Sequence, residues 1–175
     1  MTAENRQETQ AGQLGEWRWA EGWGLDLYCP DIIRLVSSRL LGLQGVCTSW
    51  DSGLLDLAGA DLPEWSAKGA HAVSPPITTV MADAWPESSC GFDEWYFFES
   101  LPDSTGLEAI CNWGVTLADA QELLGLPTGF DLQAQLNVYQ PKLVVGDGQR
   151  PFVVTRDQAI LADVLEECGR RRTRG

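Results

Sequence analysis

GFDEWYFFESLP, residues 91–102, is the stretch of the sequence with the most apolar area per residue. Its four adjacent aromatic residues predict a strand that helps to nucleate the core. Alternation along that strand places Trp95 and Phe97 on one face, while Tyr96 and Phe98 point to the other. Both faces are then apolar in the middle, which is typical of a strand inside a sheet. Three carboxylates lie toward the strand ends: Asp93, Glu94 and Glu99.

Short alternating segments on both sides of this strand predict a largely antiparallel sheet. A turn signal at 102–106 and alternating residues at 107–113 predict a hairpin with the aromatic strand. A second hairpin is predicted from residues 142–145 and 152–154. Residues 132–139 alternate as a strand would, but they also present apolar side chains on one helical face, so a helix is the alternative there. Further strands are predicted at two places within 16–29 and at 45–51 and 77–82.

Three helices are indicated by apolar residues at helical spacing. Their expected ranges are 30–41, 116–125 and 155–168. The first begins with a proline, which suits the first turn of a helix, and stops before Gly42. The other two begin with capping boxes, formed by Thr116 with Asp119 and by Thr155 with Gln158.

These elements predict an α+β fold, a single domain with a mainly antiparallel sheet of about seven or eight strands and three helices. A chain of 175 residues with 44% hydrophobic residues can bury one core. Residues 1–13 lack valine, isoleucine, leucine and aromatic residues and predict a flexible N-terminal arm, so the domain is expected to span 14–169. Residues 170–175 form a basic C-terminal tail, and 52–76 form a long irregular loop that holds His71.

The chain is strongly acidic, with a formal net charge of −13 from 25 acidic and 12 basic residues. Four of the basic residues lie in 170–175, so residues 1–169 hold eight bases against 25 acids, a charge of −17. Such a body repels phosphate backbones and anionic membranes, so we expect no direct nucleic-acid binding and no membrane association. A basic protein partner would instead be attracted. Residues 1–13 lack an apolar signal-peptide core, and the expected location is cytoplasmic.

Known catalytic and metal-binding patterns are not found in the sequence. The five cysteines are far apart and odd in number, which favours reduced thiols over a disulfide framework. Because His71 is the single histidine, neither a zinc site nor a nucleophile with a histidine base has local support. The sequence has no phosphate-binding, dinucleotide-binding or hydrolase motif. We therefore expect no metal and no cofactor.

A hydrolase is an alternative, because carboxylates are abundant and the chain has eight tryptophans that could line a cleft. Glu94 would work with Glu99 or Asp93 as general acid and base. Residues five apart on a strand point to opposite faces and lie roughly 16 Å apart, which weighs against the first pair. The deciding observation is two carboxylates about 5 to 10 Å apart in one pocket. The candidates for that pair are Asp51, Asp93, Glu94 and Glu99.

A binding function agrees best with the composition, because aromatic side chains anchor protein interfaces and charge steers the partner. We expect a small acidic non-catalytic binding protein, an inhibitor or adaptor of a basic protein partner. Immunity proteins, antitoxins and anti-defence proteins are built on this logic. A structural subunit of a larger assembly is a second alternative, which would show a wide exposed apolar patch. The candidate partner-binding residues are Asp51, Asp93, Glu94, Trp95, Glu99 and Asp103.

Overall fold

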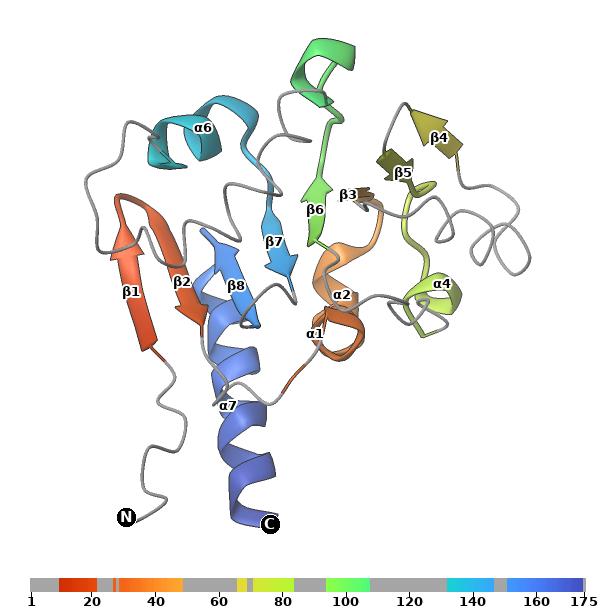
Figure 1. Ribbon diagram of the computed structural model, residues 1–175. Coiled ribbons are helices and arrows are strands. Elements are labelled where there is room, and N and C mark those ends of the chain that lie inside the picture. Colours follow the sequence, from red (N-terminus) through yellow and green to blue (C-terminus); the bar gives the residue numbers. More distant parts are fainter. Residues whose placement is uncertain are drawn as a thin grey trace, which may run out of the picture.

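The computed structural model describes residues 10–21, 27, 29–48, 66–68, 71–83, 94–107, 132–146 and 151–174. Within these residues the chain forms an eight-stranded antiparallel sheet in the order β1-β2-β8-β7-β6-β3-β5-β4 (Figure 1). The strands are β1 Gln10–Leu14, β2 Trp17–Glu21, β3 Gln44–Thr48, β4 Ser66–Lys68, β5 His71–Val73, β6 Glu94–Phe98, β7 Leu143–Gly146 and β8 Phe152–Thr155. The helices are α1 Cys29–Leu35, α2 Ser37–Leu40, α4 Thr79–Asp83, α6 Leu132–Tyr139 and α7 Gln158–Arg174, and residues 104–107 form a further helical turn. The predicted α+β class and antiparallel sheet are confirmed, while several individual elements differ.

The aromatic strand β6 lies in the interior of the sheet, as its sequence predicts. It pairs with β3 along one edge and with β7 along the other, and all five of its residues are buried. Trp95 and Phe97 belong to one core cluster, and Tyr96 and Phe98 belong to a second. The expected hairpin between β6 and 107–113 is therefore wrong, because both edges of β6 are already occupied. Residues 108–113 lie outside the described residues.

Helices cover both faces of the sheet. Apolar residues of α1, α2, α4 and α7 pack with Trp95 and Phe97 on one face. On the other face, Leu136 and Tyr139 of α6 pack with Tyr96 and Phe98. Figure 1 shows the long helix α7 running along β2 and β8. The double covering explains why β6 needs large apolar side chains on both faces.

Two segments that alternate like strands are helical. Residues 132–139 form α6, in which Leu136 is fully buried and Val138 is 68% exposed. A helix buries only the residues on the side that faces the core. The apolar and polar alternation of 132–139 therefore does not mark two faces of a strand. The predicted strand at 77–82 instead leads into α4, where Ala82 is buried and Val80 is exposed.

Of the two strands predicted within 16–29, the first is observed as β2, while most of the second lies outside the described residues and Cys29 begins α1. β2 runs without a turn from Trp17 to Glu21, and its partner is the upstream strand β1. β1 begins at Gln10, so residues 10–13 of the expected flexible arm belong to the sheet. An edge strand needs only backbone pairing, which small and polar residues can also provide. Gly12 contributes by its small size, since a Cβ there would lie 2.6 Å from Trp19.

The predicted loop at 52–76 contains a short hairpin, and His71 is the first residue of its strand β5. The expected helix at 30–41 is divided into α1 and α2, with Val36 between them. The helix predicted at 116–125 lies outside the described residues.

The C-terminal helix α7 is longer than predicted, and its N-cap lies two residues after the expected Thr155. It begins at Gln158 and continues through Gly169 to Arg174, so the basic tail forms its last turns. Ion pairs join Arg171 to Glu167 on the same helix and to Asp31 on α1, and they favour continuation of the helix past Gly169. The cap is Asp157, whose carboxylate accepts the N–H of Ala159 at 2.9 Å.

Candidate functional site

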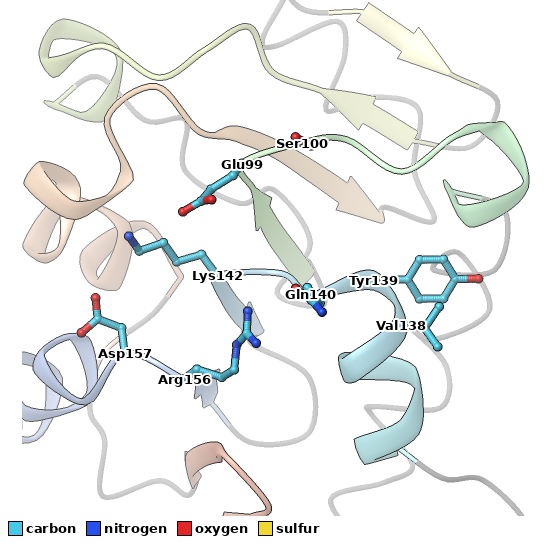
Figure 2. Close-up of a pocket in the computed structure, with 8 residues that line it drawn as sticks. All are labelled: Glu99, Ser100, Val138, Tyr139, Gln140, Lys142, Arg156 and Asp157. Carbon is cyan, nitrogen blue, oxygen red and sulfur yellow. The ribbon is translucent and has the colours of Figure 1, made fainter.

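A pocket of about 570 Å³ opens at one end of the central strands (Figure 2). Four chain segments meet there: the ends of β6, α6 and β8 and the start of β7. Glu99 and Ser100 follow β6, Val138, Tyr139 and Gln140 end α6, Lys142 precedes β7, and Arg156 and Asp157 connect β8 to α7. A volume of this size is in the range of small-ligand sites.

Antiparallel register brings these segments to the same rim. Phe97 of β6 pairs with Leu143 of β7, and Leu143 pairs in turn with Thr155 of β8. Hydrogen bonds also fix Lys142 between the two neighbouring strands. Its N–H donates to the carbonyl of Phe97 on β6 at 2.7 Å. The Thr155 hydroxyl donates to the carbonyl of Lys142, also at 2.7 Å. The charged residues that flank these strands are thereby held at the pocket.

The guanidinium of Arg156 lies over an aromatic ring. It lies 4.9 Å from the ring centroid of Trp17, a cation–π contact. Trp17 is fully buried, and its Nε1–H donates to Oδ1 of Asn137 on α6 at 2.8 Å. This contact favours a position of the guanidinium over the ring, and the planar fork of N–H donors in an arginine matches a two-oxygen acceptor.

Two carboxylates lie in the same pocket as the two cations. Figure 2 shows Lys142 extending on the side where Glu99 and Asp157 lie, while Arg156 points toward Gln140. Among the described residues, no ion pair within 4.0 Å joins Lys142 or Arg156 to a carboxylate. The four formal charges cancel, although the body of the protein is strongly acidic.

Glu94 lies at the other end of β6, inside the sheet. Its side chain is buried and accepts the Tyr96 hydroxyl at Oε2, at 2.7 Å. Burial raises the pKa of Glu94 from 4.5 to about 8, and the hydrogen bond from Tyr96 opposes part of that rise. Gly146 lies opposite on β7, so the strand leaves room for the ring of Phe152 and for Glu94. Glu94 is therefore mostly uncharged at neutral pH.

The structure divides the six predicted partner-binding residues. Glu99 is exposed and lines the pocket. Asp103 is exposed as well, and its carboxylate accepts the N–H of Gly106 at 2.8 Å. Glu94 and Trp95 are each only 2% exposed, so burial removes both from any contact surface. The other two, Asp51 and Asp93, lie outside the described residues.

The pocket contains residues that sequence reasoning did not select, chiefly Lys142, Arg156 and Asp157. Arg156 and Asp157 fall inside the predicted capping box of α7, where they look like ordinary helix-start residues. In the structure, Thr155 is the last residue of β8, and its hydroxyl accepts the N–H of Asp157 at 3.0 Å. No local sequence signal distinguishes a helix-start residue from a pocket-lining residue here, because the pocket depends on the register between strands.

The carboxylate pair expected of a hydrolase is not formed by Glu94 and Glu99. Glu94 is enclosed in the sheet, whereas Glu99 lines the pocket. Pairs that include Asp51 or Asp93 involve residues outside those described. The large exposed apolar side chains of the described residues are spread over elements on both sides of the sheet: Leu41, Val80, Val138 and Leu165.

Over the described ranges, no group of three or more histidine, cysteine, aspartate or glutamate side chains could hold a metal ion. The side chains of Cys47 and Cys168 are both buried. None of the helices in the described part of the chain is long and apolar enough to cross a bilayer.

Together these features define an α+β protein with an open antiparallel sheet, helices on both faces and a pocket of mixed charge at one end of the central strands. No protein-family model, curated protein or solved structure matches the chain. Any functional conclusion therefore depends on the fold, the pocket and the charge.

Proposed function

We propose that the protein is a non-catalytic binding protein, an inhibitor or adaptor that docks a basic protein partner over the pocket. The observation that supports this most is the pocket itself, where four charged side chains form no ion pair within the described residues and lie beside an exposed valine. Protein interfaces commonly combine a central apolar side chain with a surrounding rim of polar and charged ones, and this pocket has both kinds of group.

Long-range attraction to a basic partner comes from the whole chain. The formal net charge of −13 produces a negative potential around the molecule. Opposite charge raises the rate of encounter and disfavours acidic competitors, and salt weakens both effects. A positively charged partner is therefore the class of protein that this chain would meet most often.

Short-range contact needs an anchor, and the end of α6 provides one. Val138 is 68% exposed and lies beside the half-buried ring of Tyr139 at the edge of the pocket. Apolar and aromatic groups surrounded by polar ones are the usual composition of binding hot spots. Glu99, which is exposed across the pocket, supplies a carboxylate for a partner cation.

The proposal is tested by capture on the immobilised full-length chain. A lysate of the source cells is passed over the wild-type protein and over Val138→Asp and Glu99→Lys variants. We expect a basic protein to be retained by the wild type and released as salt rises above about 0.15 M, where the Debye length falls below about 8 Å. Both variants should retain much less of this basic protein than the wild type does. The captured protein is then purified, and its affinity is measured directly.

Val80→Asp is the matched control, because Val80 is also a highly exposed valine but lies on α4, away from the pocket. It should retain the partner like the wild type. Retention that is indifferent to salt, retention of acidic proteins alone, or equal retention by the Val138→Asp variant would each contradict the proposal.

A further inference from the structure

The four charged groups of the pocket point to a specific ligand chemistry. We infer that the pocket binds a chain end that carries a carboxylate and a cationic group together, as a C-terminal arginine or lysine does. This inference rests on the proposed binding function and states which part of a basic partner the pocket accepts.

The carboxylate site is Arg156. An arginine side chain presents its N–H donors in a planar fork that matches a two-oxygen acceptor, and among the described residues no carboxylate forms an ion pair with Arg156. The hydrogen bond from Trp17 to Asn137 positions the indole ring, and the cation–π contact favours one position of the guanidinium over that ring. A favoured position in the unbound protein lowers the ordering cost of binding. Gln140, toward which Arg156 points, adds an amide to the same side of the pocket.

The cation site is the side formed by Glu99 and Asp157. The Asp157 carboxylate is oriented by its hydrogen bond to the Ala159 N–H, which uses Oδ1. Glu99 is exposed and lines the pocket from the end of β6. Lys142 extends on the same side without an ion pair to either carboxylate among the described residues, so the three side chains together have a formal charge of −1. One negative charge then remains on this side for a ligand cation.

Size and charge agree with an amino-acid end group. A pocket of about 570 Å³ has room for an arginine residue together with its terminal carboxylate. The pocket contains two positive and two negative groups, so a ligand that carries one charge of each sign leaves it neutral. A phosphate dianion would bring two negative charges next to Glu99 and Asp157, and a simple amine would leave Arg156 without a partner.

Isothermal titration of the full-length chain with three small probes tests the inference. Nα-acetylarginine carries both charged groups, Nα-acetylcitrulline lacks the cation, and Nα-acetylargininamide lacks the carboxylate. We expect Nα-acetylarginine to bind, and each of the other two to bind about tenfold more weakly, because a charged hydrogen bond is lost in each. No binding of Nα-acetylarginine, or equal binding of all three probes, would overturn the inference.

Variants assign each end of the probe to its side chain. In Arg156→Gln, Nα-acetylarginine should bind no better than its amide, while its preference over Nα-acetylcitrulline remains. In Glu99→Gln the preference over Nα-acetylcitrulline should fall, and the preference over the amide should remain. Arg172→Gln and Glu16→Gln remove exposed charges outside the pocket and should leave both preferences unchanged. The assignment would be contradicted if Arg156→Gln lost the preference over Nα-acetylcitrulline and Glu99→Gln lost the preference over the amide.

The source of the end group is distinguished by a peptide. Tighter binding of acetyl-Gly-Gly-Arg than of Nα-acetylarginine indicates the C-terminus of a protein chain, and equal binding indicates a free amino-acid derivative. The two proposals can fail separately. A basic partner that is captured through Val138 while the probes do not bind overturns only this inference. Probe binding without any captured basic partner overturns only the proposed function.

Discussion

Glu94 shows how the tertiary environment of one side chain can reverse its expected role. Its position beside four aromatic residues made it a candidate for a partner surface, since charged residues usually face water. In the structure it is enclosed between β3 and β7 and bonded to Tyr96. Whether a strand-end carboxylate faces solvent or the interior depends on what covers the sheet there, and no local pattern contains that information.

Glu94→Gln is expected to change how stability depends on pH. The folded pKa of about 8 lies above the ordinary value of 4.5, so the folded state binds more protons between these values. The contribution of Glu94 to stability is fully present below pH 4.5 and is lost as the pH rises through about 8. Glutamine stays neutral, so the variant should melt at a higher temperature than the wild type at pH 8.5, with a smaller difference at pH 5.

Thermal denaturation followed by circular dichroism at several pH values measures this effect. Glu99→Gln is the control, because it makes the same change of side chain at an exposed position. A Glu94→Gln variant that is less stable than the wild type at pH 8.5 would contradict the burial of an uncharged carboxyl group.

Elements with distinctive patterns were predicted well, and ambiguous ones were not. β6 and the hairpin of β7 with β8 were confirmed, because large apolar side chains and a glycine turn leave few alternatives. Residues 132–139 fit both a strand and a helix, and packing against the sheet through Leu136 decided for α6. Short segments depend on such tertiary contacts more than on propensity.

Two glycines in different elements should respond oppositely to alanine. Gly169 lies within α7 with open space where a Cβ would point, so Gly169→Ala should stabilise the protein by about 0.5 to 1 kcal/mol. Gly146 lies on β7, where a Cβ would overlap the ring of Phe152, so Gly146→Ala should destabilise it by about 1 to 3 kcal/mol. Urea denaturation measures both. A loss of stability in the first variant would contradict the continuation of α7 past Gly169.

At the level of the whole chain, self-repulsion should make stability depend on salt. A formal charge of −13 destabilises the compact state, and dissolved ions screen this repulsion. We expect the melting temperature to rise by about 3 °C between low salt and 0.5 M NaCl, which corresponds to about 1 kcal/mol. KCl should give the same rise if screening is the cause. An unchanged or lower melting temperature would show that local ion pairs, such as Arg39 with Asp163, dominate instead.

The sequence by itself determined the α+β class, the antiparallel pairing, the interior position of the aromatic strand and the acidic character of the surface. These properties follow from composition and from side-chain alternation, which are local. Only the tertiary structure decided that Glu94 and Trp95 are buried and that Glu99 shares a pocket with Lys142, Arg156 and Asp157. The pocket joins residues as far apart as 99 and 157, and the register of β6, β7 and β8 brings them together. That register is set by the packing of both sheet faces, which no single segment of the sequence encodes.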